Sequence, residues 1–168
     1  MNRFLLLLSW LVLLIPSQAV ASVKDELVLK AMFITRFVQF TEWPPPPILQ
    51  HRFCVYQDQA MHQALTVQLG AQHAAPSVML IESPTQVASC HVLVLTTTNR
   101  EALQGWADAV ASSPLLIIAD NSEAFRSLAT ISLVTEPDGM TFRINHSSAL
   151  ARGLRLSAQL LKLAREVK

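Results

Sequence analysis

Apolar side chains recur at helical spacing over residues 24–42 and predict a helix there. They form two stripes, one of Leu29, Phe33, Phe37 and Phe40 and the other of Leu27, Ala31, Ile34 and Val38. This is more apolar surface than a single core contact needs, so we expect the helix to lie between two layers or to be partly covered by another chain. The prolines at 44–47 then end it, because proline lacks an amide donor and clashes with the preceding turn.

Short apolar runs and helical patterns alternate through the middle of the chain. Strands are predicted at 52–56, 77–81, 91–96 and 115–119, and helices at 59–70 and 99–112. The last of these strands is almost entirely aliphatic, as expected of a strand that is buried on both faces of a sheet. The alternation indicates parallel crossover units and a three-layer α/β/α arrangement.

The pattern changes near the C-terminus. Runs at 130–135 and 141–145 flank Pro137-Asp138-Gly139, a turn sequence in which glycine adopts positive φ, so a C-terminal β-hairpin is predicted. From Ser147 onward apolar residues repeat at helical spacing and predict a terminal helix docked on the sheet; they are Leu150, Leu154, Leu160 or Leu161, Ala164 and Val167. We therefore expect an α/β fold with a mixed, mostly parallel sheet, a C-terminal hairpin and a C-terminal helix.

The first 21 residues have the pattern of a signal peptide. Arg3 supplies the positive charge, residues 4–15 are almost entirely apolar, and residues 19–21 read Ala-Val-Ala, a small-residue cleavage site. We expect residues 1–21 to be removed, so that the mature chain begins at Ser22. Retention as a membrane anchor is the alternative, but the apolar run is shorter than the ~20 residues that span a bilayer.

Residues 22–168 have the length of a single domain. The signal holds one of the 13 basic residues and none of the 12 acidic ones, so the mature chain carries twelve of each. A neutral chain argues against nucleic-acid binding, which needs basic groups to displace counterions. The four glycines are isolated, and neither G-x-S-x-G nor H-E-x-x-H occurs. We expect a protein that is not an enzyme and that uses no cofactor and no metal.

The two cysteines, Cys54 and Cys90, are expected to form a disulfide, because an exported chain folds in an oxidising compartment. Two free buried thiols are the alternative. A zinc site would combine the cysteines with His51 and His91. Adjacent strand residues point to opposite faces, however, so Cys90 and His91 are not expected to reach one ion.

Asp58 and Asp120 each follow a predicted strand, at the edge where open α/β sheets usually bind ligands. They are candidates for a small-molecule site. Asp, Asn and Ser are also the residues that cap helices, and residues 120–122 read Asp-Asn-Ser just before a predicted helical turn. Capping is therefore the favoured interpretation at Asp120.

Glu42 and Trp43 lie between the first helix and the proline run. Tryptophan is a frequent anchor of protein interfaces, because it buries a large rigid surface at a small entropic cost. Packing in the core is the alternative for Trp43, since most aromatic side chains are buried there.

Several blocks in order along the chain resemble the YfiR/HmsC-like family of periplasmic regulators. They are Lys30-Ala31-Met32-Phe33 with Phe37, Phe40 and Glu42-Trp43-Pro44; Phe53-Cys54-Val55; the strand after Cys90; Ile144-Asn145; and Gly153-Leu154-x-Leu156-Ser157 with Leu160-Leu161-x-Leu163-Ala164. Together these blocks cover nearly all of the mature chain.

The resemblance implies a periplasmic repressor that holds the sensing region of an inner-membrane diguanylate cyclase inactive and so lowers cyclic di-GMP and biofilm formation. It also implies a homodimer and withdrawal of the repressor by an outer-membrane lipoprotein. Phe33, Phe37, Glu42 and Trp43 are the candidate partner-binding residues. The alternative, from another functional class, is a small-molecule-binding sensor that uses Asp58 and Asp120.

The chain departs from the family pattern at three places. It has only Cys54 and Cys90, whereas some members carry a second cysteine pair. Residues 127–129 read Ser-Leu-Ala where glycines are usual, and Gln57 stands where a glycine is common. These departures concern loops and the partner surface rather than the fold.

Overall fold

The computed structural model describes residues 18–70, 76–110, 113–137 and 139–168. In chain order its elements are α1 (Gln18–Gln39), β1 (Thr41–Glu42), β2 (Arg52–Tyr56), α2 (Gln59–Gly70), β3 (Ser77–Ile81), the 3₁₀ helix η1 (Pro84–Ser89), β4 (Val92–Leu95), α3 (Arg100–Val110), β5 (Leu116–Ala119), α4 (Ser122–Ser127), β6 (Ile131–Glu136), β7 (Gly139–Ile144), α5 (His146–Ala151), β8 (Arg155–Leu156), α6 (Ala158–Leu163) and β9 (Glu166–Val167). Residues 1–17 of the expected signal peptide lie outside the described residues, and its last residues, 18–21, fall in the first turn of α1.

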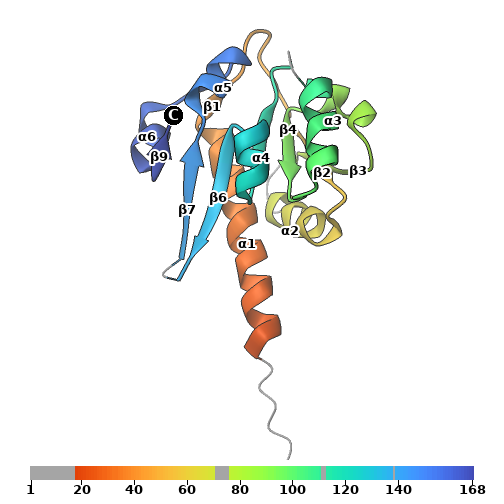
Figure 1. Cartoon of the computed structure of the whole chain (residues 1–168), viewed down its shortest axis with the longest axis vertical. Helices are drawn as coiled ribbons and strands as arrows, with labels where there is room; N and C mark the ends of the chain where they lie inside the picture. Colours follow the sequence, from red (N-terminus) through yellow and green to blue (C-terminus); the bar gives the residue numbers. More distant parts are fainter. Residues whose placement is uncertain (1–17, 71–75, 111–112, 138) are drawn as a thin grey trace, which may run out of the picture.

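The main sheet has seven strands in the order β3-β2-β4-β5-β6-β7-β9. The first five of these are parallel to one another, β7 runs antiparallel to β6, and β9 runs parallel to β7. The β6–β7 hairpin closes at the pair Glu136 and Gly139, where glycine takes a φ of 141°. The mixed, mostly parallel sheet and the C-terminal hairpin are thus confirmed (Figure 1).

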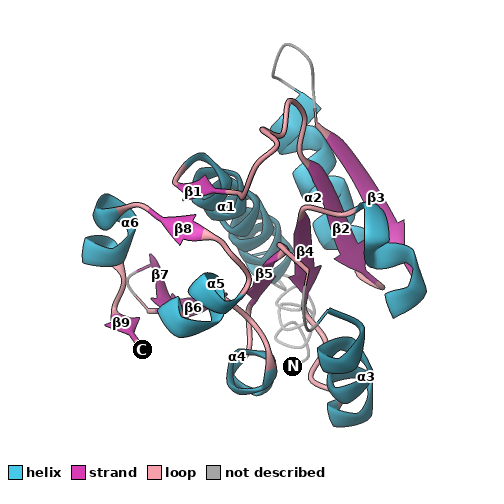
Figure 2. Cartoon of the chain, turned by 90° about the horizontal axis from the view of Figure 1, so that it is seen from above, coloured by secondary structure: helices cyan, strands magenta, loops and turns pink. Residues whose placement is uncertain are grey.

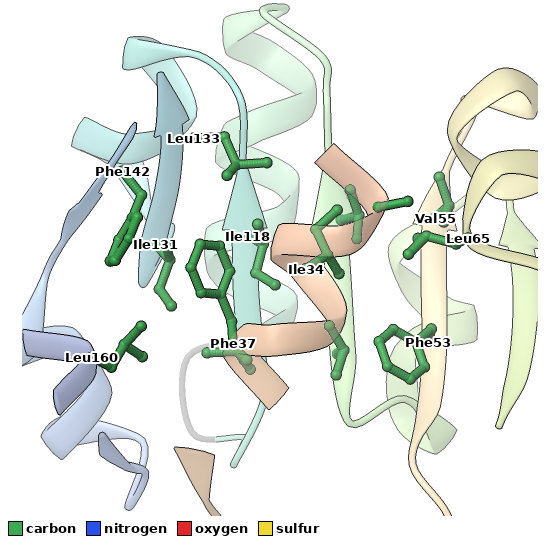
Figure 3. Packing of buried hydrophobic residues seen from close by; sticks show 14 of the residues in the cluster. Ile34, Phe37, Phe53, Val55, Leu65, Ile118, Ile131, Leu133, Phe142 and Leu160 are labelled. Carbon is green, nitrogen blue, oxygen red and sulfur yellow. The ribbon is translucent and has the colours of Figure 1, made fainter. Parts of the chain in front are cut away.

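Helices cover both faces of this sheet, so the fold has the expected three layers (Figure 2). On one face α1 and α2 pack over a cluster to which the sheet contributes Phe53 and Val55 of β2 (Figure 3). On the other face α3, α4 and η1 cover a second cluster that contains Cys54 and Trp106. The side chains of β2 alternate between the two clusters, as the strand pleat requires. Every residue of β4 and β5 is buried, which explains their aliphatic composition.

Gln57, directly after β2, has a φ of 50°, in the left-handed region that favours glycine. Its amide donates to the Ile81 carbonyl at 3.1 Å, so the turn is tied to the end of β3. A glycine would adopt this backbone conformation without strain.

The first predicted helix ends earlier than its apolar pattern indicated. α1 stops at Gln39, and Thr41 and Glu42 form a short strand that pairs antiparallel with β8. Glu42 is therefore a strand residue with a largely exposed side chain rather than the end of a helix.

The C-terminal segment contains helices, as predicted, but not one continuous helix. Gly153, with a φ of 73°, ends α5, and the Leu154 amide turns back to the Ala149 carbonyl at 2.9 Å. β8 then pairs with β1, and Ser157 caps α6 by accepting from the Leu160 amide. The apolar residues of this segment serve different elements, so their helical spacing was misleading: Leu154, Leu156 and Leu160 are buried, whereas Leu150 and Leu163 are exposed.

Candidate functional site

The two predicted ligand residues lie at the carboxyl edge of the sheet, and both are held by the protein itself. Asp58 Oδ1 accepts from the Met61 amide at 2.9 Å and so caps α2. Asn121, rather than Asp120, caps α4 by accepting from the Ala124 amide at 2.9 Å. Capping by the Asp-Asn-Ser run was the right interpretation, but the residue that performs it is the asparagine.

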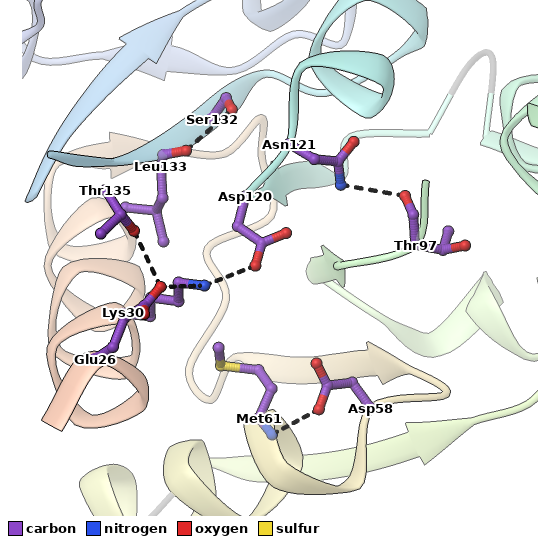
Figure 4. Close-up of polar contacts among 10 residues, drawn as sticks. All are labelled: Glu26, Lys30, Asp58, Met61, Thr97, Asp120, Asn121, Ser132, Leu133 and Thr135. Atoms are coloured by element: carbon purple, nitrogen blue, oxygen red, sulfur yellow. Dashed lines mark hydrogen bonds and ion pairs between the residues drawn. The ribbon is translucent and has the colours of Figure 1, made fainter. Parts of the chain in front are cut away.

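Asp120 instead forms an ion pair with a lysine of α1. Lys30 Nζ donates to Asp120 Oδ2 at 2.8 Å and lies 2.9 Å from Glu26 Oε1, one helical turn earlier (Figure 4). Thr135 of β6 donates to the same Glu26 oxygen at 3.0 Å. The network ties α1 to the ends of two adjacent strands, at the edge where related architectures bind ligands. A ligand at Asp120 would have to displace Lys30.

The electrostatics of this network favour the charged forms. Burial lowers the pKa of Lys30, but the hydrogen bonds to Asp120 and Glu26 outweigh it, and the net effect is a raised pKa. The hydrogen bond from Lys30, together with that from Thr135, lowers the pKa of Glu26. Lys30 therefore stays protonated and Glu26 ionised across the neutral range.

Two of the predicted partner-binding residues belong to the core. Phe37 is 1% exposed and packs edge-on against Phe142, with ring centroids 4.9 Å apart. Phe33 is partly buried and lies 6.0 Å from Phe37 and 6.2 Å from Phe142. Phe37 is thus a core residue rather than an interface anchor, and Phe33 mainly completes the same aromatic cluster.

Trp43 borders a surface pocket. Its ring packs on His51 with centroids 4.5 Å apart, and its indole nitrogen is buried without a hydrogen-bond partner. The pocket has a volume of about 340 Å³; its walls include Trp43, the prolines of the 44–46 segment, Val87, Cys90 and His91. Glu42, the fourth predicted residue, lies 3.9 Å from Arg155 in an exposed ion pair.

Cys54 and Cys90 form a disulfide with Cα atoms 5.9 Å apart, within the usual range for such bridges. The bridge leaves neither sulfur as a free thiolate, so the zinc alternative has no thiolate ligands. His91 is engaged elsewhere: its Nδ1 accepts from the Arg52 amide at 3.0 Å, and its ring is 5.9 Å from that of His51.

Both histidines are disposed to stay neutral. Burial, and then the proximity of His91, lowers the pKa of His51. Burial, and then the Arg52 cation, lowers the pKa of His91. Their neutral forms are therefore the stable ones in the folded protein at neutral pH.

An exposed apolar surface of the α1–α2 layer was not among the predicted sites. Val28 of α1 is 51% exposed and Val67 of α2 is 73% exposed. They border a groove of about 520 Å³ between the two helices. The excess of apolar residues on α1 indicated a covered face, but it did not show which face the core would leave open.

Over the described residues, no set of three or more His, Cys, Asp or Glu side chains is arranged to hold a metal ion. Within the same residues, no helix combines the length and the apolar character needed to cross a membrane. The carboxylates at the sheet edge are used in caps and ion pairs. The fold and these sites together define a layered α/β domain with a mixed sheet between two layers of helices (Figure 2).

The family model described as YfiR/HmsC-like matches residues 28–165, and the chain belongs to this family. The family is regulatory rather than catalytic and acts in the periplasm, in cyclic di-GMP signalling. The expectation from the sequence blocks is thereby confirmed at the level of the family. Comparison with curated proteins found no match.

Solved structures share the fold at low sequence identity. A conserved domain protein from Vibrio cholerae O1 biovar El Tor has a TM-score of 0.58 and 13% identity, over 84% of this chain and 60% of that one. The ABC domain in complex with L-Trp from Streptococcus pneumoniae has a TM-score of 0.57 and 12% identity, over 85% of this chain and 60% of that one. The chain thus spans about 60% of the length of either structure, and at this identity the likeness concerns the fold alone.

Proposed function

We propose that this protein represses an inner-membrane diguanylate cyclase by binding the cyclase's periplasmic region, and so lowers cyclic di-GMP and biofilm formation. The observation that carries the proposal is the family match, which spans residues 28–165 and therefore nearly all of the expected mature chain. Repression by contact requires exposed surface rather than a catalytic centre. The open apolar groove between α1 and α2 supports such a role.

The expected signal peptide fits the same proposal. Export, followed by removal of residues 1–21, would place the domain in the periplasm, where the cyclase's nucleotide substrate is absent. A regulator in that compartment acts through the outer part of a membrane protein. The same proposal includes two further partners. One is a second copy of this chain in a homodimer, and the other is an outer-membrane lipoprotein that withdraws the repressor from the cyclase.

The direct test is association of residues 22–168 with the isolated periplasmic region of a membrane diguanylate cyclase from the same cell. We expect a complex at micromolar concentration, and deletion of the gene is expected to raise cyclic di-GMP. A chain that does not associate, combined with unchanged cyclic di-GMP after deletion, contradicts the proposal.

A small-molecule-binding sensor is the second candidate, and the pocket beside Trp43 is the observation that favours it. Its volume of about 340 Å³ lies within the range of small-ligand sites, and the indole N–H of Trp43 is a buried donor without a partner. Asp58 and Asp120, the other candidates, are already occupied by the α2 cap and by Lys30. A bound metabolite is expected to raise the melting temperature of the wild type. A broad metabolite screen without any shift in the melting temperature of the wild type contradicts this candidate.

A further inference from the structure

The groove between α1 and α2 is formed by two helices that lie side by side (Figures 1 and 2). From α1 it is lined by Lys24, Leu27 and Val28, and from α2 by Ala60, Gln63, Ala64, Val67 and Gln68. The opposite side of α2 carries Met61, Leu65 and Leu69, which are buried against the sheet. α2 is therefore apolar on two sides. The core buries Met61, Leu65 and Leu69, and on the groove side it contacts Ala64 but leaves Val67 exposed.

The walls of the groove determine what kind of segment it accepts. Both walls are α-helices, whose backbone N–H and C=O groups are bonded within each helix except in the first and last turns. A segment that docks there receives no continuous ladder of backbone hydrogen bonds from the walls. A helix satisfies its own backbone groups, whereas an isolated strand does not, so the walls favour a helical segment. Ala60 and Ala64 are one turn apart on α2, and their small side chains allow a third helix to approach closely.

The charge of the groove indicates which charge the docked segment carries. Among the described residues that line it, Lys24 is the only charged one, and its side chain is exposed. Cleavage before Ser22 would add an α-amino group two residues away. An isologous contact between two copies would place one groove with its Lys24 against another, and none of the described lining residues is acidic. A partner helix with an acidic side chain beside its apolar face fits better than a second copy.

We propose that the α1–α2 groove is the docking site for an amphipathic helix of the partner, with apolar residues facing Val28 and Val67 and an acidic residue facing Lys24. This rests on the proposed function, and the helix belongs to the periplasmic region of the cyclase.

The test measures the affinity of that periplasmic region for residues 22–168 and for single variants. Val28→Glu and Val67→Glu place a carboxylate in the apolar contact, and each is expected to weaken binding by about tenfold or more. Lys24→Glu is expected to weaken binding and to reverse the sign of its salt dependence. The matched control is Leu150→Glu on α5, which adds the same charge at a side chain that is 56% exposed and does not line the groove. All of the substituted positions are exposed, so unchanged melting temperatures are expected.

The outcomes separate this inference from the proposed function. If the wild type does not bind, the proposed function fails. If the wild type binds and Val67→Glu and Leu150→Glu bind equally well, the groove is not the docking site. A Val67→Glu variant that loses self-association but keeps its affinity for the cyclase would make the groove a contact between copies, which also overturns the inference. A photo-cross-linking residue at position 67 is expected to label a segment with helical apolar spacing, and labelling of an extended segment refutes a helical occupant.

Discussion

The disulfide between Cys54 and Cys90 is expected to contribute a large part of the stability of this domain. The two residues are 36 positions apart, and in the chain-entropy model closing a loop of this length stabilises the native state by about 4 kcal/mol. The stability of a domain of this size is on the order of 5–15 kcal/mol. Both cysteines are buried beneath α3 and η1, at 0% and 9% exposure, so opening the bridge also leaves two thiols within an apolar cluster.

The assay is urea unfolding of the oxidised protein, of the reduced protein and of the variants Cys54→Ala, Cys90→Ala and the double variant. Removing either sulfur opens the bridge, so each single variant is expected to lose about 3–4 kcal/mol and the double variant little more. Mass spectrometry without reductant is expected to find the Cys54 and Cys90 peptides joined. If the losses of unfolding free energy in the two single variants add up in the double variant, the bridge is not their common cause. A reduced protein whose unfolding free energy is within about 0.5 kcal/mol of that of the oxidised protein would also show that the bridge contributes little.

Three other predictions concern stability. Lys30→Met is expected to lower the free energy of unfolding in urea by about 2 kcal/mol. Breaking a fully buried ion pair costs ~3–5 kcal/mol, and the loss is smaller here because Asp120 keeps some solvent contact. No measurable loss would contradict a structural role for the ion pair between Lys30 and Asp120. Gln57→Gly is expected to raise the free energy of unfolding by about 0.5–1 kcal/mol, because it relieves a left-handed backbone, and a loss would argue against that geometry. Because burial lowers the pKa values of His51 and His91, the unfolded state binds more protons, so stability is expected to fall as the pH drops below about 6.5. His91→Gln should flatten this pH dependence, and an unchanged slope would show that His91 does not contribute to it.

Local patterns were sufficient for much of the fold. The aliphatic runs of β4 and β5, the β6–β7 turn with its glycine, and a capping residue ahead of α4 are all determined by neighbours within a few positions. The same reasoning failed between α5 and α6, because the apolar residues there bury against different partners. Helical spacing cannot distinguish one helix from two short helices separated by a left-handed glycine and a strand pair.

The candidate site depended on long-range contacts that local patterns do not reveal. Lys30 and Asp120 are 90 positions apart, and nothing near Asp120 indicated that a lysine of α1 would neutralise it. Phe37 was a candidate partner-binding residue of the predicted repressor. The structure uses that side chain against Phe142 and leaves Val28 exposed instead. Which side of an apolar helix stays open depends on how the layers assemble.

The proposed function requires this domain to control cyclic di-GMP synthesis across a membrane without meeting the nucleotide. The most direct measurement uses full-length cyclase in vesicles, with its periplasmic region facing the lumen and its catalytic region outside, and residues 22–168 enclosed in the lumen. We predict that the enclosed protein lowers the rate of cyclic di-GMP formation from external GTP, and that the same protein added outside has no effect. An equal rate with and without the enclosed protein, at a lumenal concentration that saturates binding to the isolated periplasmic region, would contradict the proposed function.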